Sequence, residues 1–232
     1  MSVLARLRTG ARAFAGAWLL VSHVALADDG ADHALFFHEI GVALNVPTGV
    51  ATALSYTPTF VLFDRRLNVG VGARFSSHFG SGGVDYPNGD ARLLEIGARN
   101  TLNVDAPRTF ALNAMFAISA RIVAGLEVGM NIDLLGVGFG SGVTGAYSGA
   151  DPALTGSQRA SPTRFNLLLL GRHDRGQLDS EFFASYWFGR WGVRAGASHM
   201  STEYTTDRRL DAGNDRFRAS ATRFFIAAGH RF

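Results

Sequence analysis

The chain of 232 residues contains no cysteine. It also contains no lysine, since all 22 of its basic residues are arginines. The missing cysteine excludes disulfides, thiolate metal sites, iron–sulfur clusters and a cysteine nucleophile. The missing lysine excludes a P-loop lysine, a Schiff-base lysine and a serine/lysine hydrolase. A disordered chain is also excluded, since 47% of the residues are hydrophobic and only 18% are charged.

The excess of positive charge lies at the N-terminus. Three arginines precede a short apolar run (residues 13–20), and an A-x-A motif, Ala25 to Ala27, follows it. This pattern predicts that residues 1–27 are a secretory signal peptide cleaved after Ala27, with residues 28–232 as one domain. An uncleaved anchor is the alternative. Removing residues 1–27 leaves 19 arginines and 19 acidic residues, so the net charge of +3 belongs to the signal and predicts no nucleic-acid partner.

After residue 28, no apolar stretch approaches the length of a membrane helix, which is about 20 residues. Instead, apolar and polar residues alternate with a period of two. In the run that begins at Leu67 the odd positions are apolar, and the even positions are Asn, Gly, Arg or Ser. Similar runs begin at Phe110 and Leu126. Runs of about ten residues with this period are typical of tilted strands that cross a bilayer.

Glycine and isolated charges of both signs share the polar face of these runs. Small residues and opposite charges suit the lumen of a narrow barrel, where paired side chains fill the interior. A soluble sandwich with one solvated face is the alternative that alternation alone leaves open. We expect lumen ion pairs among six residues, namely Glu39, Arg74, Glu127, Asp133, Arg194 and Arg223.

The last residues of the chain alternate in the same way and end in phenylalanine. One face carries Phe224, Ile226, Ala228, His230 and Phe232. This pattern resembles the terminal strand of bacterial outer-membrane β-barrel proteins, although His230 stands where an aromatic residue is more usual. The resemblance implies a Gram-negative outer-membrane location, with the lipid bilayer, lipopolysaccharide and the barrel-assembly machinery as partners. It identifies no functional subfamily.

Tight connections alternate with long ones that are rich in Gly, Asp, Asn, Pro and Ser. Because bacterial barrels have an even number of strands and short periplasmic turns, this alternation predicts an all-β fold, a closed antiparallel up-and-down barrel of eight strands. The predicted strands are 39–46, 53–63, 67–79, 110–120, 126–139, 178–188, 191–202 and 217–232.

Two further runs, 93–102 and 165–170, would give ten strands if both crossed the membrane. Ten strands would put the long segment 140–161 in the periplasm, so we prefer eight, with these two runs extending or folding over the outer rim.

One pair of residues is a weak candidate for catalysis. His199 and Ser201 share the lipid-facing side of one predicted strand, and they resemble the His-x-Ser motif of the lipid A 3-O-deacylases, where histidine is the general base and serine the nucleophile. Thr202 stands where that family has an Asn, and no Glu occurs at the expected distance downstream. We therefore predict no catalytic residue, no metal and no cofactor.

These observations favour a non-enzymatic outer-membrane barrel with a filled lumen and a structural or surface-interaction role for its long outer loops. The alternative is a channel or transporter for small or hydrophobic solutes, which requires ten or more strands or a lateral opening. A lipid A-modifying hydrolase that uses His199 and Ser201 is a third hypothesis.

Overall fold

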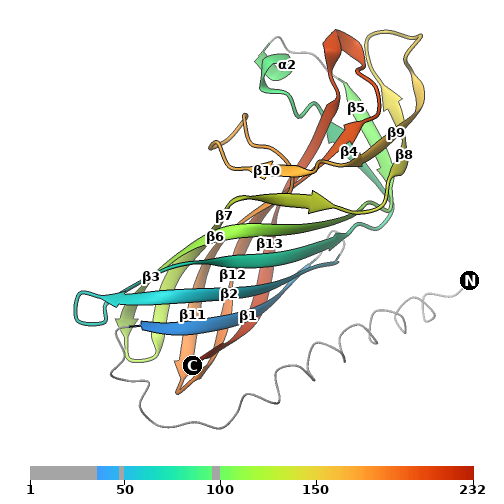
Figure 1. Cartoon of the computed structure of the whole chain (residues 1–232). Coiled ribbons are helices and arrows are strands. Elements are labelled where there is room, and N and C mark those ends of the chain that lie inside the picture. Colours follow the sequence, from blue (N-terminus) through green and yellow to red (C-terminus); the bar gives the residue numbers. More distant parts are fainter. Residues whose placement is uncertain (1–35, 47–49, 96–99) are drawn as a thin grey trace, which may run out of the picture. The chain divides into compact units, whose positions relative to one another are not determined.

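A computed structural model describes residues 36–46, 50–95 and 100–232 (Figure 1). They belong to one compact unit, Ala34–Phe232. The predicted signal peptide and its cleavage site at Ala25 and Ala27 lie outside the described residues. Within the described ranges, no helix has the length and apolarity of a membrane span.

Eight antiparallel strands form a closed barrel within the described residues. They are β1 (Phe36–Val46), β2 (Val50–Leu62), β3 (Leu67–Phe79), β6 (Arg108–Val123), β7 (Leu126–Phe139), β11 (Leu178–Phe188), β12 (Trp191–Thr206) and β13 (Arg216–Arg231). Each strand pairs with its neighbours in this order, and β1 pairs with β13 to close the barrel, with Glu39 opposite Arg231. The predicted fold and strand number are confirmed, and every predicted span corresponds to one of these strands.

The two ends of the barrel differ in their connections. At one end, which we call the turn end, tight turns join β2 to β3, β6 to β7 and β11 to β12. Two of these turns contain a glycine with positive φ, Gly125 (78°) and Gly189 (64°), a backbone conformation that glycine adopts without steric cost. Long connections join β3 to β6, β7 to β11 and β12 to β13 at the opposite end, which we call the loop end.

The outer surface of the barrel is apolar. Alternate residues of the strands point outward and remain exposed, as Phe60, Val71, Leu112 and Phe224 show. A bulge at Leu134 shifts the register of β7 against β6, so that the odd residues beyond it point outward. An apolar exterior on a closed barrel is the surface that hydrocarbon chains cover, and a soluble sandwich would bury it.

The connections at the loop end contain short strands that extend the barrel sheet, which sequence analysis did not predict. The short strands β4 (Gly83–Pro87), β5 (Thr101–Asp105), β8 (Val143–Ser148) and β9 (Gly156–Pro162) pair in the order β9-β8-β5-β4. β9 pairs with the loop end of β12, and Asn88 after β4 bridges to Phe217 of β13. By these pairings, the four strands and the loop ends of β12 and β13 form a closed ring, which we call the loop module. Figure 1 shows β4, β5, β8 and β9 gathered at one end of the barrel.

The loop module has a hydrophobic core of its own. Its buried residues come from all six strands and the loop after β12, and they are Tyr86, Leu102, Val104, Tyr147, Ala160, Tyr204, Leu210 and Phe217. The Tyr86 and Tyr204 rings meet edge to face at 5.2 Å between centroids, and Tyr147 meets Phe217 in the same way at 5.9 Å. The loop end is therefore a packed structure.

In their described parts, the two additional runs contribute none of the eight barrel strands; residues 96–99 of the first run lie outside the described ranges. The first, 93–102, contains the end of a short helix, α2 (Ala91–Glu95), and the start of β5, so its strand-like appearance was misleading over the helical part. In the second, 165–170, only β10 (Phe165–Leu167) is a strand, and it pairs with β7 at the rim. A 3₁₀ turn, η2 (Asp211–Gly213), lies between β12 and β13.

Candidate functional site

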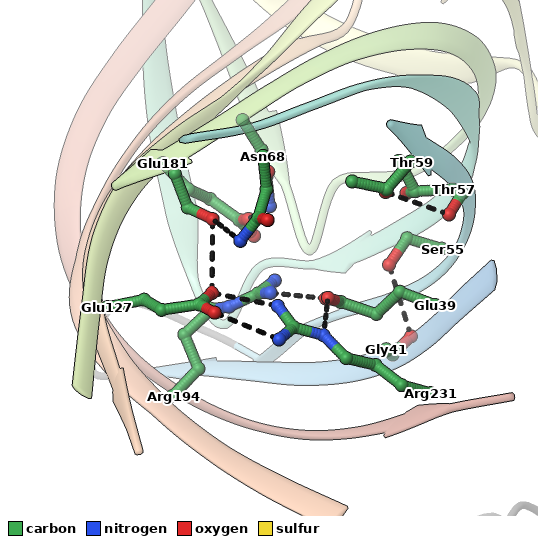
Figure 2. Close-up of polar contacts among 12 residues, drawn as sticks. Glu39, Gly41, Ser55, Thr57, Thr59, Asn68, Glu127, Glu181, Arg194 and Arg231 are labelled. Atoms are coloured by element: carbon green, nitrogen blue, oxygen red, sulfur yellow. Dashed lines mark hydrogen bonds and ion pairs between the residues drawn. The ribbon is translucent and has the colours of Figure 1, made fainter. Parts of the chain in front are cut away.

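The lumen near the turn end contains a cluster of two arginines, two glutamates and one tryptophan. Arg231 donates to Glu127 at 2.8 and 2.9 Å and to Glu39 at 3.2 Å, and Arg194 donates to Glu39 (Figure 2). The Arg231 guanidinium also lies 3.6 Å from the centre of the Trp187 ring, which is buried in the lumen. We call these residues the turn-end cluster.

Two glycines leave space in the lumen for the Trp187 side chain of this cluster. A Cβ atom on Gly192 would lie 2.5 Å from Trp187, and one on Gly229 would lie 2.9 Å from it. The glycines on the inward face of β12 and β13 therefore allow an indole ring to fill the width of the barrel beneath Arg231.

A second cluster surrounds Arg74. Its guanidinium lies 2.9 Å from Glu181, 3.4 Å from Asp133 and 3.7 Å from Asp179, and all four side chains are at most 3% exposed. The amide groups of Asn113 and Asn131 donate to Asp133 and Glu181. Three carboxylates around one guanidinium give this cluster an excess of acidic groups, which the amide donors partly compensate.

An apolar layer lies between the two clusters. It consists of Ala53, Phe183, Phe225 and Ala227. Along β11, Phe183 stands between Glu181 of the Arg74 cluster and Trp187 of the turn-end cluster. The lumen is thus filled by alternating charged and apolar layers. A cavity of about 20 Å³ lies beside Glu39 and Arg194, and one of about 10 Å³ lies beside His78 and Asp179, with room for about one water molecule each.

The structure brings five of the six predicted lumen residues into ion pairs. Glu39, Glu127 and Arg194 lie in the turn-end cluster, and Arg74 and Asp133 lie in the second cluster. Arg223 differs: within the described residues its side chain donates to His78 Nε2 at 3.0 Å and to the sulfur of Met200 at 3.8 Å, and it pairs with no carboxylate. The prediction of an ion pair at Arg223 is therefore wrong.

Sequence reasoning missed three residues that the clusters depend on. Arg231, Asp179 and Glu181 all occupy inward positions of their strands, so the period-two alternation could have found them. A further buried pair, Glu203 and Arg216, lies at the loop end of β12 and β13, against the segment that leads into β11, with 2.8 Å between Oε2 and Nη2.

Of the weak catalytic candidates, His199 is exposed and Ser201 is buried, and each bonds to a different neighbour. His199 Nδ1 lies 3.1 Å from Thr222 Oγ1, and Ser201 Oγ lies 2.8 Å from Ser220 Oγ. Within the described residues, no hydrogen bond joins His199 to Ser201 and no carboxylate orients the imidazole. A general base must reach its nucleophile by a hydrogen bond, so this geometry lacks an activated serine.

The C-terminal strand presents its alternating face to the outside. Phe224, Ile226 and Phe232 are exposed there, and the His230 ring lies between Trp191 and Phe232. Ala228 lies on the same face of β13. Whether the assembly machinery reads this face stays a prediction. Among the residues that the structure describes, no three His, Asp or Glu side chains converge into a site for a metal ion.

Comparisons with known proteins found relatives only among solved structures. No protein-family model and no curated protein matches the chain. The structure of Neisserial surface protein A (NspA) is 6% identical with a TM-score of 0.39, and the match covers 86% of this chain and 98% of that one.

Two other solved structures are similar to the same degree. Ail of Yersinia pestis, solved in complex with the heparin analogue sucrose octasulfate, is 14% identical with a TM-score of 0.36, over 85% of this chain and 97% of that one. The outer-membrane enzyme PagL is 10% identical with a TM-score of 0.38, over 83% and 98%. Because these TM-scores are low, the fold is assigned from the strand pairing of this chain.

A closed antiparallel barrel with an apolar exterior, a polar lumen, tight turns at one end and long connections at the other is the architecture of bacterial outer-membrane proteins. This chain has that fold. In this architecture the turn end corresponds to the periplasmic end of the barrel and the loop end to its outer end.

Proposed function

We propose that this protein is a non-enzymatic outer-membrane barrel whose filled lumen conducts no solute and whose loop module is a rigid surface for contacts outside the cell. The observation that carries the proposal is the pair of charged clusters, around Arg231 and around Arg74, that bridge opposite strands of the barrel. An eight-stranded barrel is just wide enough for side chains to fill, and these clusters fill it.

The loop module supports the second half of the proposal. β12 and β13 have 16 residues each, whereas about 9–11 residues suffice to cross the hydrocarbon layer. The remaining residues project beyond the membrane and pair with β9 and, through Asn88, with the segment after β4. Binding residues are commonly held on loops that a rigid scaffold positions, and this module supplies a scaffold with its own core.

The geometry around His199 and Ser201 supports a non-enzymatic role. Each side chain is satisfied by a hydroxyl of β13, and Ser201 is only 8% exposed. A nucleophile for lipid hydrolysis must be accessible and must bond to its base, and Ser201 meets neither requirement.

Conductance across a planar lipid bilayer tests the proposal. Purified protein, shown to be folded by its shift in gel position on heating, is added to the bilayer, with a trimeric porin as the conducting control. We expect no steady conducting steps from this protein. Reproducible conducting steps of fixed size would overturn the proposal that the lumen is filled and would favour the channel alternative.

A further inference from the structure

A loop at the side of the barrel carries exposed leucines next to unpaired arginines. Residues 168–176 follow β10 and lead into β11, and Figure 1 shows this loop projecting sideways at the loop end of the barrel. We propose that this lateral loop binds a phosphorylated lipid headgroup of the outer leaflet, with its leucines in the acyl layer and its arginines on the phosphate. The inference requires only that the barrel lies in a membrane, and it goes beyond the proposed function.

The lateral loop has a defined conformation. The Asp174 carboxylate accepts hydrogen bonds from the backbone N–H groups of Leu169 (2.6 Å) and Gly171 (3.1 Å), which closes the tip. At its base, Leu167 and Arg175 exchange two backbone hydrogen bonds of 3.0 and 2.9 Å. Leu170 at the tip adopts a positive φ of 63°, a conformation that is unfavourable for leucine. The tip is therefore held in one shape with its leucines pointing away from the chain's own core.

These leucines are exposed. Leu170 is 83% exposed and Leu169 is 50% exposed, and Phe165 at the start of β10 is 51% exposed. Leu170 is the most exposed large hydrophobic residue that the structure describes. A rigid loop that displays apolar side chains beside an apolar barrel wall gains free energy only if hydrocarbon covers them.

The position of the loop fits the boundary of the membrane. The Leu168 N–H donates to the carbonyl of Leu134, on the wall of β7 beside the exposed Leu135. The other end of the loop rests on β13, where Arg218 donates to the carbonyls of Arg172 (3.0 Å) and Asp174. The lateral loop therefore extends from the apolar wall of the barrel to its polar rim.

The outward residues of β13 mark that rim. Going toward the loop end, exposed Ile226 and Phe224 give way to Thr222 and Ser220, and Arg218 follows. Arg218 lies four residues beyond Thr222, about 13 Å along the strand. That places the arginines of the loop at the level of lipid headgroups, above the acyl layer.

The charges of this region are not balanced. Arg172, Arg175, Arg216 and Arg218 lie in or against the lateral loop, and the acidic residues here are Asp174 and Glu203. Glu203 is held by Arg216, and Asp174 caps the loop. Within the described residues, the exposed Arg172 and Arg175 form no ion pair. A phosphate group is an anion that such exposed guanidinium groups bind well, because it accepts several charge-assisted hydrogen bonds.

The first experiment locates the loop tip. Since the chain has no cysteine, Leu170→Cys gives one labelling site for an environment-sensitive fluorophore, and Ala153→Cys in the loop module gives the matched control. The labelled proteins are reconstituted in phosphatidylcholine vesicles that contain lipid A and acyl-brominated lipid. We expect strong quenching at position 170 and none at position 153. Equal quenching, or a water-like emission at position 170, would overturn the proposal.

The second experiment tests the phosphate contact. Arg172→Gln/Arg175→Gln removes the two exposed charges, and Arg159→Gln/Arg209→Gln removes two exposed arginines of the loop module as the control. The affinity for lipid A is measured as the amount of lipid A that the purified barrel retains from vesicles. We expect this affinity to fall roughly thirtyfold in the first variant and to stay unchanged in the control. Equal retention in both variants would contradict the proposal.

Two controls separate the possible causes of failure. Inorganic phosphate at millimolar concentration should leave lipid A bound, and displacement by phosphate alone would mean that the site takes a free anion instead of a lipid. The heat-dependent gel shift shows that each variant is folded. Conductance is measured on the same samples, so the result for the lateral loop does not depend on the result for the lumen.

Discussion

Replacing Arg74 by methionine should destabilise the barrel far more than removing one of the carboxylates around it. Arg74→Met keeps most of the side-chain volume but leaves Asp133, Asp179 and Glu181 in the lumen without a cation, and each of these carboxylates is at most 3% exposed. Breaking a buried ion pair by removing one partner costs about 3–5 kcal/mol, and three carboxylates depend on this guanidinium.

The matched control is Asp179→Asn. This variant keeps Arg74 with its closest partner, Glu181, and reduces the excess of acidic groups in the cluster. The amide can still accept the hydrogen bond that Ser198 donates to Asp179 at 2.5 Å. We therefore expect a change of about 1 kcal/mol or less in the free energy of unfolding.

Urea unfolding in lipid vesicles measures both variants, with tryptophan fluorescence and the heat-dependent gel shift as independent readouts. The expected difference of several kcal/mol corresponds to two or more powers of ten in the unfolding equilibrium. The double variant Arg74→Met/Glu181→Gln should recover part of the loss, because it removes the carboxylate nearest to the missing cation. The reasoning is refuted if Arg74→Met costs no more than Asp179→Asn.

Two further predictions concern the loop module. Phe217 is fully buried in the core of the module, so Phe217→Ala should lower the stability of the module by about 3–5 kcal/mol and expose β4, β5, β8 and β9 to proteolysis. The barrel itself should stay protected and keep its heat-dependent gel shift. Cleavage equal to that of the wild type would contradict an independent core. Burial raises the pKa of Tyr86, and burial raises the pKa of Tyr204 to about 12 despite the hydrogen bond it makes with Arg108. Because these folded-state pKa values exceed the unfolded value of about 10, the contribution of the two phenols to stability is complete below pH 10 and is lost as the pH rises toward 12. The module should therefore unfold in this pH range, with a delayed rise in tyrosinate absorbance at 295 nm. A rise that is complete by pH 10 would show that the phenols are not buried.

The eight spans were predictable because a barrel in lipid imposes the same constraint on every strand. Each residue either faces hydrocarbon or faces the lumen, so the alternation in the run that begins at Leu67 is as clear as the one that begins at Phe110. The tight turns and long connections then fixed the direction of each strand. The bulge at Leu134 interrupts the pattern, and it shifts the outward face of β7 without ending the strand.

The partners of the charged residues were harder to predict than their side of the sheet. Arg74 on β3 reaches Glu181 on β11, 107 positions away in the sequence. Alternation shows that both side chains face inward, but the height at which they meet depends on the stagger of all the strands between them. Alternation likewise predicted correctly that the Arg223 side chain faces the lumen, but it could not predict the partner. The side chain that Arg223 meets at its height in the barrel is His78.

The loop module was missed because its strands are short and its pairing is non-local. β4 and β5 have five residues each, so Val84 and Tyr86 in one strand, like Leu102 and Val104 in the other, give too short an alternation to stand out among glycines and aspartates. Tyr204 and Phe217 continue the inward alternation of β12 and β13 beyond the membrane, where the same face that lines the lumen becomes the face of a hydrophobic core. Alternation therefore identifies a strand but does not show where the strand leaves the membrane. The position of the membrane boundary is indicated by the outward face, where apolar side chains give way to His199, Thr222 and the arginines near the lateral loop.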